Sequence, residues 1–324
     1  MSINCPICEN ERKVNLLDDY KLGIKTDIKY FKFLKIYHCE ECEFSFANPM
    51  PEKHDLDYYY KNIYRLPNRP PYWRDNNDEN FKKNYLSDKN LNYLLYLTIL
   101  LDFTKIENLY DFGSGDGEIG FILKKKFSKI KLFCTENDTQ CKKILGERDY
   151  TNFENVEKIN ERFDLIISSQ VLDHLTDINI FSKFYQLLKP KGSIFFEVVN
   201  CTKYYFDNRP YDSQRLLFFT KKSLEILAKK FNFEIINLSY SSYSLNDSHK
   251  FMKESQNMYE NMTKSYFSHK NVKNFIKRII PASLIEMRRN YLEIKKFKNE
   301  DRLNLFTNNT GDNCYLIRGI FRKN

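Results

Sequence analysis

Glycine is scarce in this chain: there are only 9 in 324 residues, and four of them lie between Gly113 and Gly120. Long apolar stretches are missing as well. The longest one, residues 91–103, is interrupted by three polar residues and is too short to span a bilayer. The N-terminus carries no cleavable apolar segment. These absences lead us to expect a cytoplasmic protein.

The composition bounds the number of domains. With 42% hydrophobic and 16% aromatic residues, the chain can build one catalytic domain of ordinary size and one or two small modules. Its net charge is +9, and residues 244–324 hold 16 Lys and Arg against 8 Asp and Glu. This basic part can be a solvated helical face or a surface that attracts an anionic partner, and both interpretations stay open.

The segment 109–120 reads LYDFGSGDGEIG and places its glycines at alternate positions. An apolar strand ends in Asp111, and Gly113, Gly115 and Gly117 follow. Such a concentration means that the backbone turns tightly there, or approaches a ligand where a Cβ atom would not fit. A strand, a glycine-rich turn and a following helix form the opening unit of a nucleotide-binding α/β sheet.

The carboxylates around this turn indicate which nucleotide it binds. A dinucleotide site requires the spacing G-x-G-x-x-G and a helix N-terminus that is open to a pyrophosphate. Here Glu118 occupies the third glycine position, and Asp111 and Asp116 stand beside it. Three carboxylates repel a pyrophosphate but suit a ligand with an ammonium and a sulfonium group. A dinucleotide site and a purely structural turn remain as alternatives.

The pattern D-x-G-x-G-x-G resembles the first motif of class I S-adenosylmethionine (SAM) methyltransferases. The strand 131–136 then ends in an acid that, in SAM and dinucleotide sites alike, accepts hydrogen bonds from ribose hydroxyls, unless it is only a surface carboxylate. A short strand at 150–153 would bring Asn152 or Phe153 toward the adenine. We assign the binding of SAM to Asp111, Gly113, Ser114, Gly115, Gly117, Glu136, Asn137, Ser169 and Gln170.

Later segments follow the order of the same family. Residues 163–169 form a continuous apolar run, as expected of a strand buried on both faces. They lead into 170–175, QVLDHL, which is similar to the family's vLEH signature. Residues 187–192, LLKPKG, resemble its LLKPGG turn, with Lys191 in place of a glycine. The strand that follows this turn is expected at 193–199.

The end of the chain is expected to complete the sheet. Residues 218–236 resemble the family's last helix and strand, with Asn232 in place of a glycine. Residues 313–322, NCYLIRGIFR, read as a strand that forms an antiparallel hairpin with 233–242. The resemblance implies an α/β fold with a Rossmann-like, seven-stranded methyltransferase sheet and a helical insertion before the last strand.

Two C-x-x-C knuckles stand near the N-terminus, Cys5 with Cys8 and Cys39 with Cys42. Two thiolates at this spacing chelate one face of a tetrahedral ion, and a second pair completes a closed shell of four sulfurs. Such a shell leaves no open position for substrate, so it predicts structural rather than catalytic Zn²⁺. Disulfides and a redox pair are the alternatives, and a reducing compartment argues against disulfides.

The knuckles, followed by 44–51 (FSFANPMP) and 56–64 (LDYYYKNIY), resemble the opening of a bacterial methyltransferase family with an N-terminal zinc-binding module. The deoxysugar C-methyltransferases of antibiotic pathways belong to that family, and they continue into a large C-terminal domain for which this chain has too few residues left. The resemblance implies a sugar or sugar-nucleotide substrate. We expect a zinc-ribbon module at 1–52, a helical connecting segment at 53–105, the SAM-binding core at 106–243, the basic helical insertion at 244–312 and the final strand at 313–324.

Methyl transfer from SAM is an in-line displacement, so the protein must align the acceptor and, for a hydroxyl, remove its proton. His174 follows the fourth strand and titrates near neutral pH, although it can equally be tied to the backbone. Glu197, late in the fifth strand, can bind an acceptor hydroxyl or be a paired sheet carboxylate. Tyr204 is the third candidate for the catalytic site.

The loop 200–219 passes over the expected acceptor pocket. Its Tyr204, Tyr205 and Tyr211 can stack on a sugar or a base, and Arg209 or Arg215 can bind a phosphate or a carboxylate. The alternative is that these residues only pack on the edge of the sheet.

These patterns favour a SAM-dependent methyltransferase that acts on a small anionic glycan precursor, such as a nucleotide-linked sugar in bacterial surface polysaccharide or glycan assembly. A zinc-ribbon enzyme that modifies RNA is a second hypothesis, but no RNA-binding motif is present. A SAM-binding protein without turnover is a third. Residues 274–280 mix apolar and basic groups, which fits a core-facing helix better than adsorption to a membrane surface.

Overall fold

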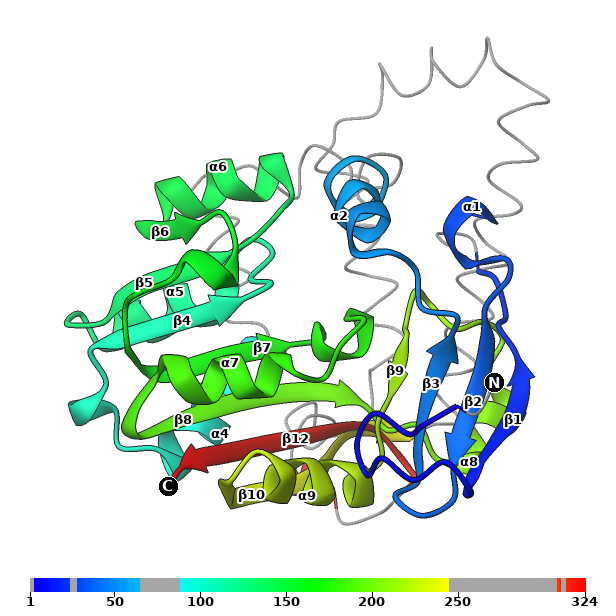
Figure 1. Ribbon diagram of the computed structural model, residues 1–324. Coiled ribbons are helices and arrows are strands. Elements are labelled where there is room, and N and C mark those ends of the chain that lie inside the picture. Colours follow the sequence, from blue (N-terminus) through cyan, green and yellow to red (C-terminus); the bar gives the residue numbers. More distant parts are fainter. Residues whose placement is uncertain (1–2, 24–27, 65–87, 245–307, 310–312) are drawn as a thin grey trace, which may run out of the picture.

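The computed structural model describes residues 3–23, 28–64, 88–244, 308–309 and 313–324 (Figure 1). The strands are β1 (Val14–Asp19), β2 (Lys35–Cys39), β3 (Phe44–Asn48), β4 (Asn108–Phe112), β5 (Lys131–Thr135), β6 (Tyr150–Phe153), β7 (Phe163–Ser169), β8 (Leu188–Val199), β9 (Leu217–Phe218), β10 (Phe233–Ser244), β11 (Asn308–Asn309) and β12 (Cys314–Lys323). The α-helices are α1 (Ile28–Phe31), α2 (Lys53–Asn62), α4 (Asp88–Leu100), α5 (Glu118–Lys126), α6 (Thr139–Glu147), α7 (Ile180–Leu187), α8 (Lys203–Asn208) and α9 (Lys221–Lys230).

Most of these strands build one large mixed sheet. Within the described residues its order is β11-β10-β12-β8-β7-β4-β5-β6, where β11 is a two-residue extension of the edge. Strands β6, β5, β4, β7 and β8 run parallel, and β12 runs antiparallel between β8 and β10. Without β11 this is the Rossmann-like, seven-stranded α/β sheet of methyltransferases, so the predicted fold class is confirmed.

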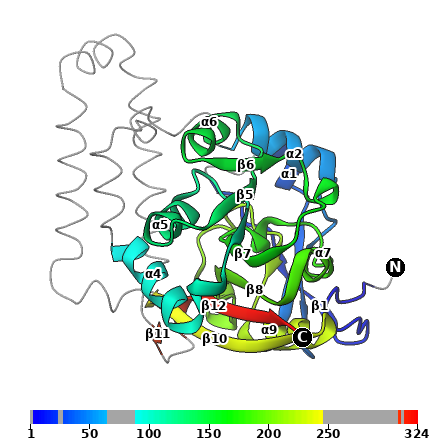
Figure 2. The same cartoon turned by 90° about the vertical axis from the view of Figure 1, so that its left-hand side faces the viewer.

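Helices cover both faces of this sheet, with α4 and α5 on one side and α7 on the other (Figure 2). Because side chains alternate along a strand, neighbouring residues of one strand supply both layers. In β7, Leu165 and Ile167 belong to the core that contains α4 and α5, whereas Ile166 belongs to the core that contains α7 and α9. The continuous apolar run of β7 thus reflects burial on both faces.

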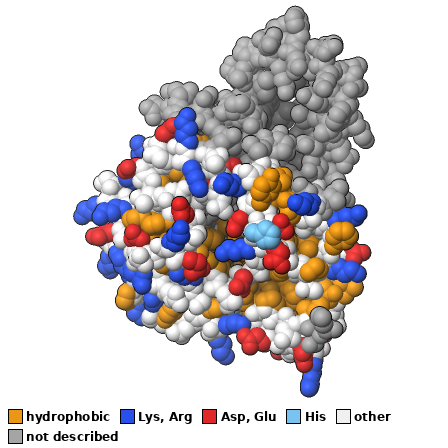
Figure 3. Space-filling view, turned by 45° about the horizontal axis from the view of Figure 1, so that its top comes forward, with side chains coloured by type: hydrophobic (Ala, Val, Ile, Leu, Met, Phe, Trp, Pro, Cys, Tyr) orange, Lys and Arg blue, Asp and Glu red, His pale blue; other side chains and the backbone are white. Residues whose placement is uncertain are grey.

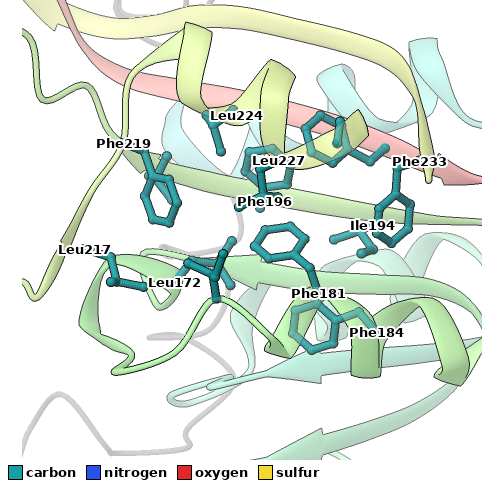
Figure 4. Packing of buried hydrophobic residues seen from close by; sticks show 14 of the residues in the cluster. Leu172, Phe181, Phe184, Ile194, Phe196, Leu217, Phe219, Leu224, Leu227 and Phe233 are labelled. Carbon is teal, nitrogen blue, oxygen red and sulfur yellow. The ribbon is translucent and has the colours of Figure 1, made fainter. Parts of the chain in front are cut away.

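The layer of α7 and α9 combines aromatic and aliphatic side chains. Phe181 of α7 and Leu227 of α9 lie beside Phe196 of β8, and Phe184 packs against Phe181 (Figure 4). The rings of Phe181 and Phe196 meet edge to face, with centroids 6.2 Å apart. Such a layer fixes the position of β8 and of the residues that follow it.

The N-terminal residues form a second, smaller antiparallel sheet in the order β1-β2-β3-β9. Its fourth strand, β9, comes from the loop after β8, and the pairing Ser45↔Phe218 and Phe46↔Leu217 joins the two parts of the chain. In Figure 1, β8 of the large sheet points toward this small sheet. The N-terminal module and the core are therefore connected through shared backbone hydrogen bonds.

Side chains strengthen this connection. The Lys230 ammonium at the end of α9 donates to the carbonyl oxygens of Pro6 (3.0 Å) and Ile7 (3.1 Å), inside the first cysteine knuckle, and pairs with Glu9. Ile7 and all but one of the four knuckle cysteines belong to the same buried cluster as the core helices α7 and α9. The module therefore shares a hydrophobic core with the large sheet.

Strand β8 begins five residues before the predicted start at residue 193, so the predicted turn 187–192 lies largely within it. The strand begins at Leu188, directly after α7, and the register shifts between Phe163↔Leu188 and Leu165↔Ser193, so residues 189–192 bulge from the ladder. Lys191, where the family has glycine, is left-handed with a φ of +61°, and Asn232 has a φ of +60°. Asn tolerates this conformation, whereas it costs about 1 kcal/mol for Lys.

The described surface carries both signs of charge, and Lys, Arg, Asp and Glu side chains are interspersed on the face in Figure 3. Within the described residues, no helix combines the length and apolar character needed to cross a membrane. The predicted helical insertion at 244–312 lies outside the described residues, apart from Ser244 at the end of β10 and the two residues of β11.

Candidate active site and metal centre

The glycine-rich turn between β4 and α5 is left-handed at each alternate glycine, with φ values of +67° at Gly113, +61° at Gly115 and +75° at Gly117. A Cβ atom at Gly113 would lie 2.7 Å from Val171 Cγ2, and one at Gly117 would lie 2.6 Å from Leu145 Cδ2. Neither the backbone nor the space admits a side chain there. The turn follows the carboxyl end of β4, where open α/β sheets bind ligands.

The acid after β5 reaches across to this turn. Glu136 Oε2 accepts a hydrogen bond from Gly115 N at 2.7 Å, and Oε1 accepts one from Asp138 N at 2.9 Å. The Asn152 side chain lies beside it, since its Oδ1 accepts from Glu136 N at 3.4 Å, and Phe153 stacks on Phe133. Asn137 stands between Glu136 and Asp138 in the chain. The Glu136 carboxylate, which the sequence assigns to the ribose, is thus held against the backbone of the glycine turn.

Burial dominates the electrostatics of Asp111. Its side chain is almost fully buried in β4, and burial raises its pKa to about 7, with smaller contributions from the charges of Glu136 and Asp116, while a hydrogen bond from Tyr150 opposes the rise. A cation beside this carboxyl group would favour its ionised form. The Ser114 hydroxyl in the same turn is buried. A turn lined by carboxylates fits the ammonium and sulfonium groups of SAM.

The end of β7 meets a buried polar network. Tyr93 of α4 is hydrogen-bonded to Ser169 Oγ (3.1 Å) and donates to Glu197 Oε1 (2.6 Å). Gln170, left-handed with a φ of +59°, donates its side-chain amide to the same Glu197 oxygen at 3.2 Å. The other oxygen, Oε2, accepts from Arg318 Nε at 2.6 Å. Glu197 therefore occupies the position of a paired sheet carboxylate that supports the predicted SAM residues of β7.

His174 ends a short 3₁₀ turn (Leu172–His174) after β7. Its Nδ1 lies 3.2 Å from the carbonyl oxygen of Gln214, which can only accept, so Nδ1 carries the proton and Nε2 carries the lone pair. Ser213 and Gln214 are both left-handed, with φ values of +53° and +61°, and this unusual turn presents the carbonyl. Burial lowers the pKa of His174, although the nearby Asp173 opposes the change. The imidazole is neutral at pH 7.

The four cysteines of the two knuckles come together in the N-terminal sheet, with all four Sγ atoms within 4.8 Å of one another. The sulfurs of Cys5 and Cys42 are 3.4 Å apart, as are those of Cys8 and Cys39. In a tetrahedral shell with Zn–S bonds of about 2.3 Å, sulfurs lie about 3.8 Å apart, so small shifts suffice to hold an ion. The four-thiol donor set suits Zn²⁺ and leaves no free coordination position.

Comparison with protein families decides the assignment. The family described as "Methyltransferase domain" matches residues 68–238, more than half of the chain. The chain belongs to this family. It is a SAM-dependent methyltransferase domain, as the glycine turn and the acidic residues around it predict, and it has an N-terminal four-cysteine cluster, as the two knuckles predict.

Three of the solved structures that the chain resembles weakly are methyltransferases. The StiE O-MT domain (residues 942–1257) has 15% identity and a TM-score of 0.45 and covers 78% of this chain and 79% of its own. Coclaurine N-methyltransferase bound to N-methylheliamine and S-adenosylhomocysteine (SAH) has 13% identity and a TM-score of 0.44, and the match covers 71% of each chain. A SAM-dependent methyltransferase from Archaeoglobus fulgidus has 16% identity and a TM-score of 0.43, and the match covers 75% of this chain and 98% of the other. Similarity at this level adds nothing to the assignment, and no curated protein matches the sequence.

The methyltransferase brings its predicted SAM residues together from three strand ends. The glycine turn follows β4, Glu136 and Asn137 follow β5, and Gln170 follows Ser169, the last residue of β7. Val171, the next residue, fills the space above Gly113, so the first and third groups are in contact. Of the catalytic candidates, Glu197 contacts Gln170, His174 lies four residues beyond it, and Tyr204 lies on α8 with 39% of its surface exposed.

The structure corrects the role expected of the loop arginines in this methyltransferase. Arg209 is buried and pairs with Asp212 and with Asp18 of the N-terminal module, at 3.1 Å for the latter. Arg215 is buried as well, and its Nε donates to Asp173 Oδ2 at 2.8 Å. Both guanidinium groups thus brace the loop internally, and neither serves as a surface site for a phosphate.

Several residues around the site were not anticipated from sequence, notably Tyr93, Asp173 and Arg318. Arg318 had a recognisable signal, since it interrupts the apolar strand β12 and a buried charge requires a partner. Glu197 interrupts β8 in the same way, and the register pairs the two residues across the strands. Tyr93 had no signal, because its helix showed no pattern that marks one residue.

Proposed function

We propose that this methyltransferase transfers the methyl group of SAM to a hydroxyl oxygen of a small glycan precursor, with a nucleotide-linked sugar as the favoured acceptor. The observation that carries the proposal is the state of His174. A neutral imidazole with its lone pair on Nε2, at the carboxyl end of β7, can accept the proton of an attacking hydroxyl.

Bound SAM supplies an activated methyl group and leaves as a neutral thioether, so the acceptor oxygen needs alignment and deprotonation. The Gln214 carbonyl fixes the tautomer and orientation of His174. When Nε2 takes the hydroxyl proton, an imidazolium forms 3.8 Å from Asp173 Oδ1, whose negative charge stabilises it.

The glycan class is supported by the N-terminal module, whose sequence resembles that of sugar-modifying methyltransferases and which the structure joins to the loop 200–219. Tyr204 on α8 exposes 39% of its surface and can stack on the apolar face of a sugar ring. The four cysteines fit a structural Zn²⁺, and we propose that this ion holds the module in place.

Incubation with SAM and a panel of nucleotide sugars, read by mass spectrometry, tests the proposal. The expected product is 14 Da heavier than its precursor, and His174→Gln should abolish it while leaving the affinity for SAH unchanged. No product from any nucleotide sugar would count heavily against the glycan assignment. Salt-sensitive binding and methylation of tRNA would instead favour an RNA substrate.

A further inference from the structure

Unsatisfied polar atoms gather where the N-terminal module meets the carboxyl end of β7. The hydroxyls of Tyr20 and Tyr60 and the Oδ1 atom of Asp173 are buried and have no hydrogen-bond partner among the described residues. The great majority of buried polar atoms form a hydrogen bond, because burying a polar atom without one is unfavourable. Three such atoms in one region point to a ligand that supplies the missing hydrogen bonds.

Contacts from all sides place these residues together. The Tyr60 ring meets the His174 ring edge to face, with centroids 6.2 Å apart, and His174 Nε2 lies 3.8 Å from Asp173 Oδ1. Tyr20 follows β1 directly. Burial raises the pKa of its hydroxyl, and the charges of Asp212 and Tyr60, which act on the same hydroxyl, raise it further. The next residue, Lys21, donates its backbone N–H to Asp212 Oδ2, and its carbonyl oxygen accepts from Asp212 N. We call Tyr20, Tyr60, Asp173 and His174 the junction site, because β1, α2 and the end of β7 contribute to it.

The charges around the junction site indicate what it binds. Among the described residues, Arg215 is the cation whose charge acts on Tyr20, Tyr60 and His174, and its three nitrogens are engaged by Asp173, Tyr205 and Tyr315. Arg209 is held by carboxylates in the same way. A cation that is already neutralised by a buried carboxylate offers little to a phosphate. Two phenol hydroxyls, a carboxylate oxygen and an imidazole nitrogen instead suit groups that both donate and accept hydrogen bonds.

We propose that the junction site binds the uncharged, polyhydroxylated ring of the acceptor, a pyranose or similar polyol, and that the N-terminal module thereby contributes Tyr20 and α2 contributes Tyr60 to substrate recognition. This inference rests on the proposed function, since it names the part of the acceptor that lies beside His174. The aromatic faces of the two tyrosines add apolar contact to the C–H groups of such a ring. Any phosphate of the acceptor lies elsewhere.

Ligand-observed saturation-transfer NMR on the SAH-loaded protein provides a test that needs no knowledge of the acceptor. The probes are D-glucose, D-galactose and L-rhamnose, with UDP as an anionic comparison. We expect pyranose signals in the wild type that fall at least about fivefold in Tyr60→Phe and in Tyr20→Phe, a change of more than RT in binding free energy. Tyr58→Phe, on the same helix but 56% exposed, is the matched control and should leave them unchanged.

The melting temperature is a second measurement, because substitution of a tyrosine with a purely structural role would change it differently from substitution of a tyrosine that binds the ligand. Removing a hydroxyl that has no protein partner should leave the melting temperature of the sugar-free protein unchanged or raise it. A fall of several degrees in Tyr60→Phe together with an unchanged pyranose signal would show that ordered water occupies the region, and this would overturn the inference. Absence of any pyranose signal in the wild type would overturn it as well.

The two proposals can fail separately. If the wild type methylates a nucleotide sugar and Tyr60→Phe does so with the same KM, the junction site is wrong and the proposed function stands. If pyranoses bind in a Tyr60-dependent way and no sugar or nucleotide sugar is methylated, the junction site stands and the proposed function is wrong.

Discussion

The buried pair of Glu197 and Arg318 allows a quantitative prediction that separates two roles of Glu197. Each side chain is 1% exposed, and the Nε–Oε2 distance is 2.6 Å. Arg318 also donates to Asn92 Oδ1 and stacks over the Tyr93 ring at 4.8 Å. Removal of one partner therefore leaves an uncompensated charge buried within this network. Such a loss costs about 3–5 kcal/mol.

We expect Arg318→Met to lower the free energy of unfolding by about 3–5 kcal/mol and Glu197→Gln by about 3 kcal/mol, because glutamine keeps the volume and part of the hydrogen bonding. At about 2–4 °C per kcal/mol for a domain of this size, the melting temperature should fall by about 6–20 °C in Arg318→Met and by about 6–12 °C in Glu197→Gln. The double variant should lose less than the sum of the two, since neither charge is then left alone. Urea denaturation and thermal scanning measure all three.

Arg322→Met is the matched control, because Arg322 lies on the same strand and pairs with Glu234 at 3.9 Å, with 32% and 51% of the two side chains exposed. An exposed pair of this kind contributes less than about 1 kcal/mol. If Arg318→Met destabilises no more than Arg322→Met, the reasoning fails. If Glu197→Gln leaves stability intact but abolishes methyl transfer, Glu197 contacts the acceptor and is not a supporting carboxylate.

Three further results are expected. Gly117→Ala places a Cβ 2.6 Å from Leu145 Cδ2 at a φ of +75°, so the affinity for SAH, measured by calorimetry, should fall at least about tenfold. Gly146→Ala is the control and should leave this affinity unchanged, because no atom lies within 4 Å of its Cβ. Burial holds the pKa of His174 below its usual 6.5, so activity should rise with pH through an apparent pKa below 6.5 and reach a plateau by about pH 7.5; a midpoint above 7 contradicts the assignment. Cys39→Ser should remove the zinc measured by mass spectrometry and lower the melting temperature, while Cys134→Ser, buried in β5, retains the metal.

Local patterns were sufficient to predict the large sheet. The predicted strands at 150–153 and 163–169 match β6 and β7, and the hairpin of β10 and β12 forms as expected. The turn at Gly113, Gly115 and Gly117 was recognisable because only glycine takes its backbone conformation without a penalty. The knuckle spacing likewise predicted that four cysteines would meet.

Long-range pairings could not be read from the sequence. A two-residue strand such as β9 has no periodicity of its own, so its pairing with β3 depends on where the rest of the chain places it. Arg209 looked like a surface cation in a loop, since nothing local shows that Asp18, 191 residues away, lies beside it. Partners of buried charges are decided by tertiary packing, which acts between distant segments.

β12 (Cys314–Lys323) is the last long strand of the chain, yet it lies inside the sheet with β8 on one side and β10 on the other. A fragment limited to residues 68–238, the region that matches the family, would lack β12, so β8 and β10 would have no strand between them. It would also lack the N-terminal sheet that packs against α9. Edge hydrogen bonds and a wide apolar surface would then face water. Both ends of the polypeptide are therefore structural parts of the catalytic domain, and shortened versions for expression need to retain them.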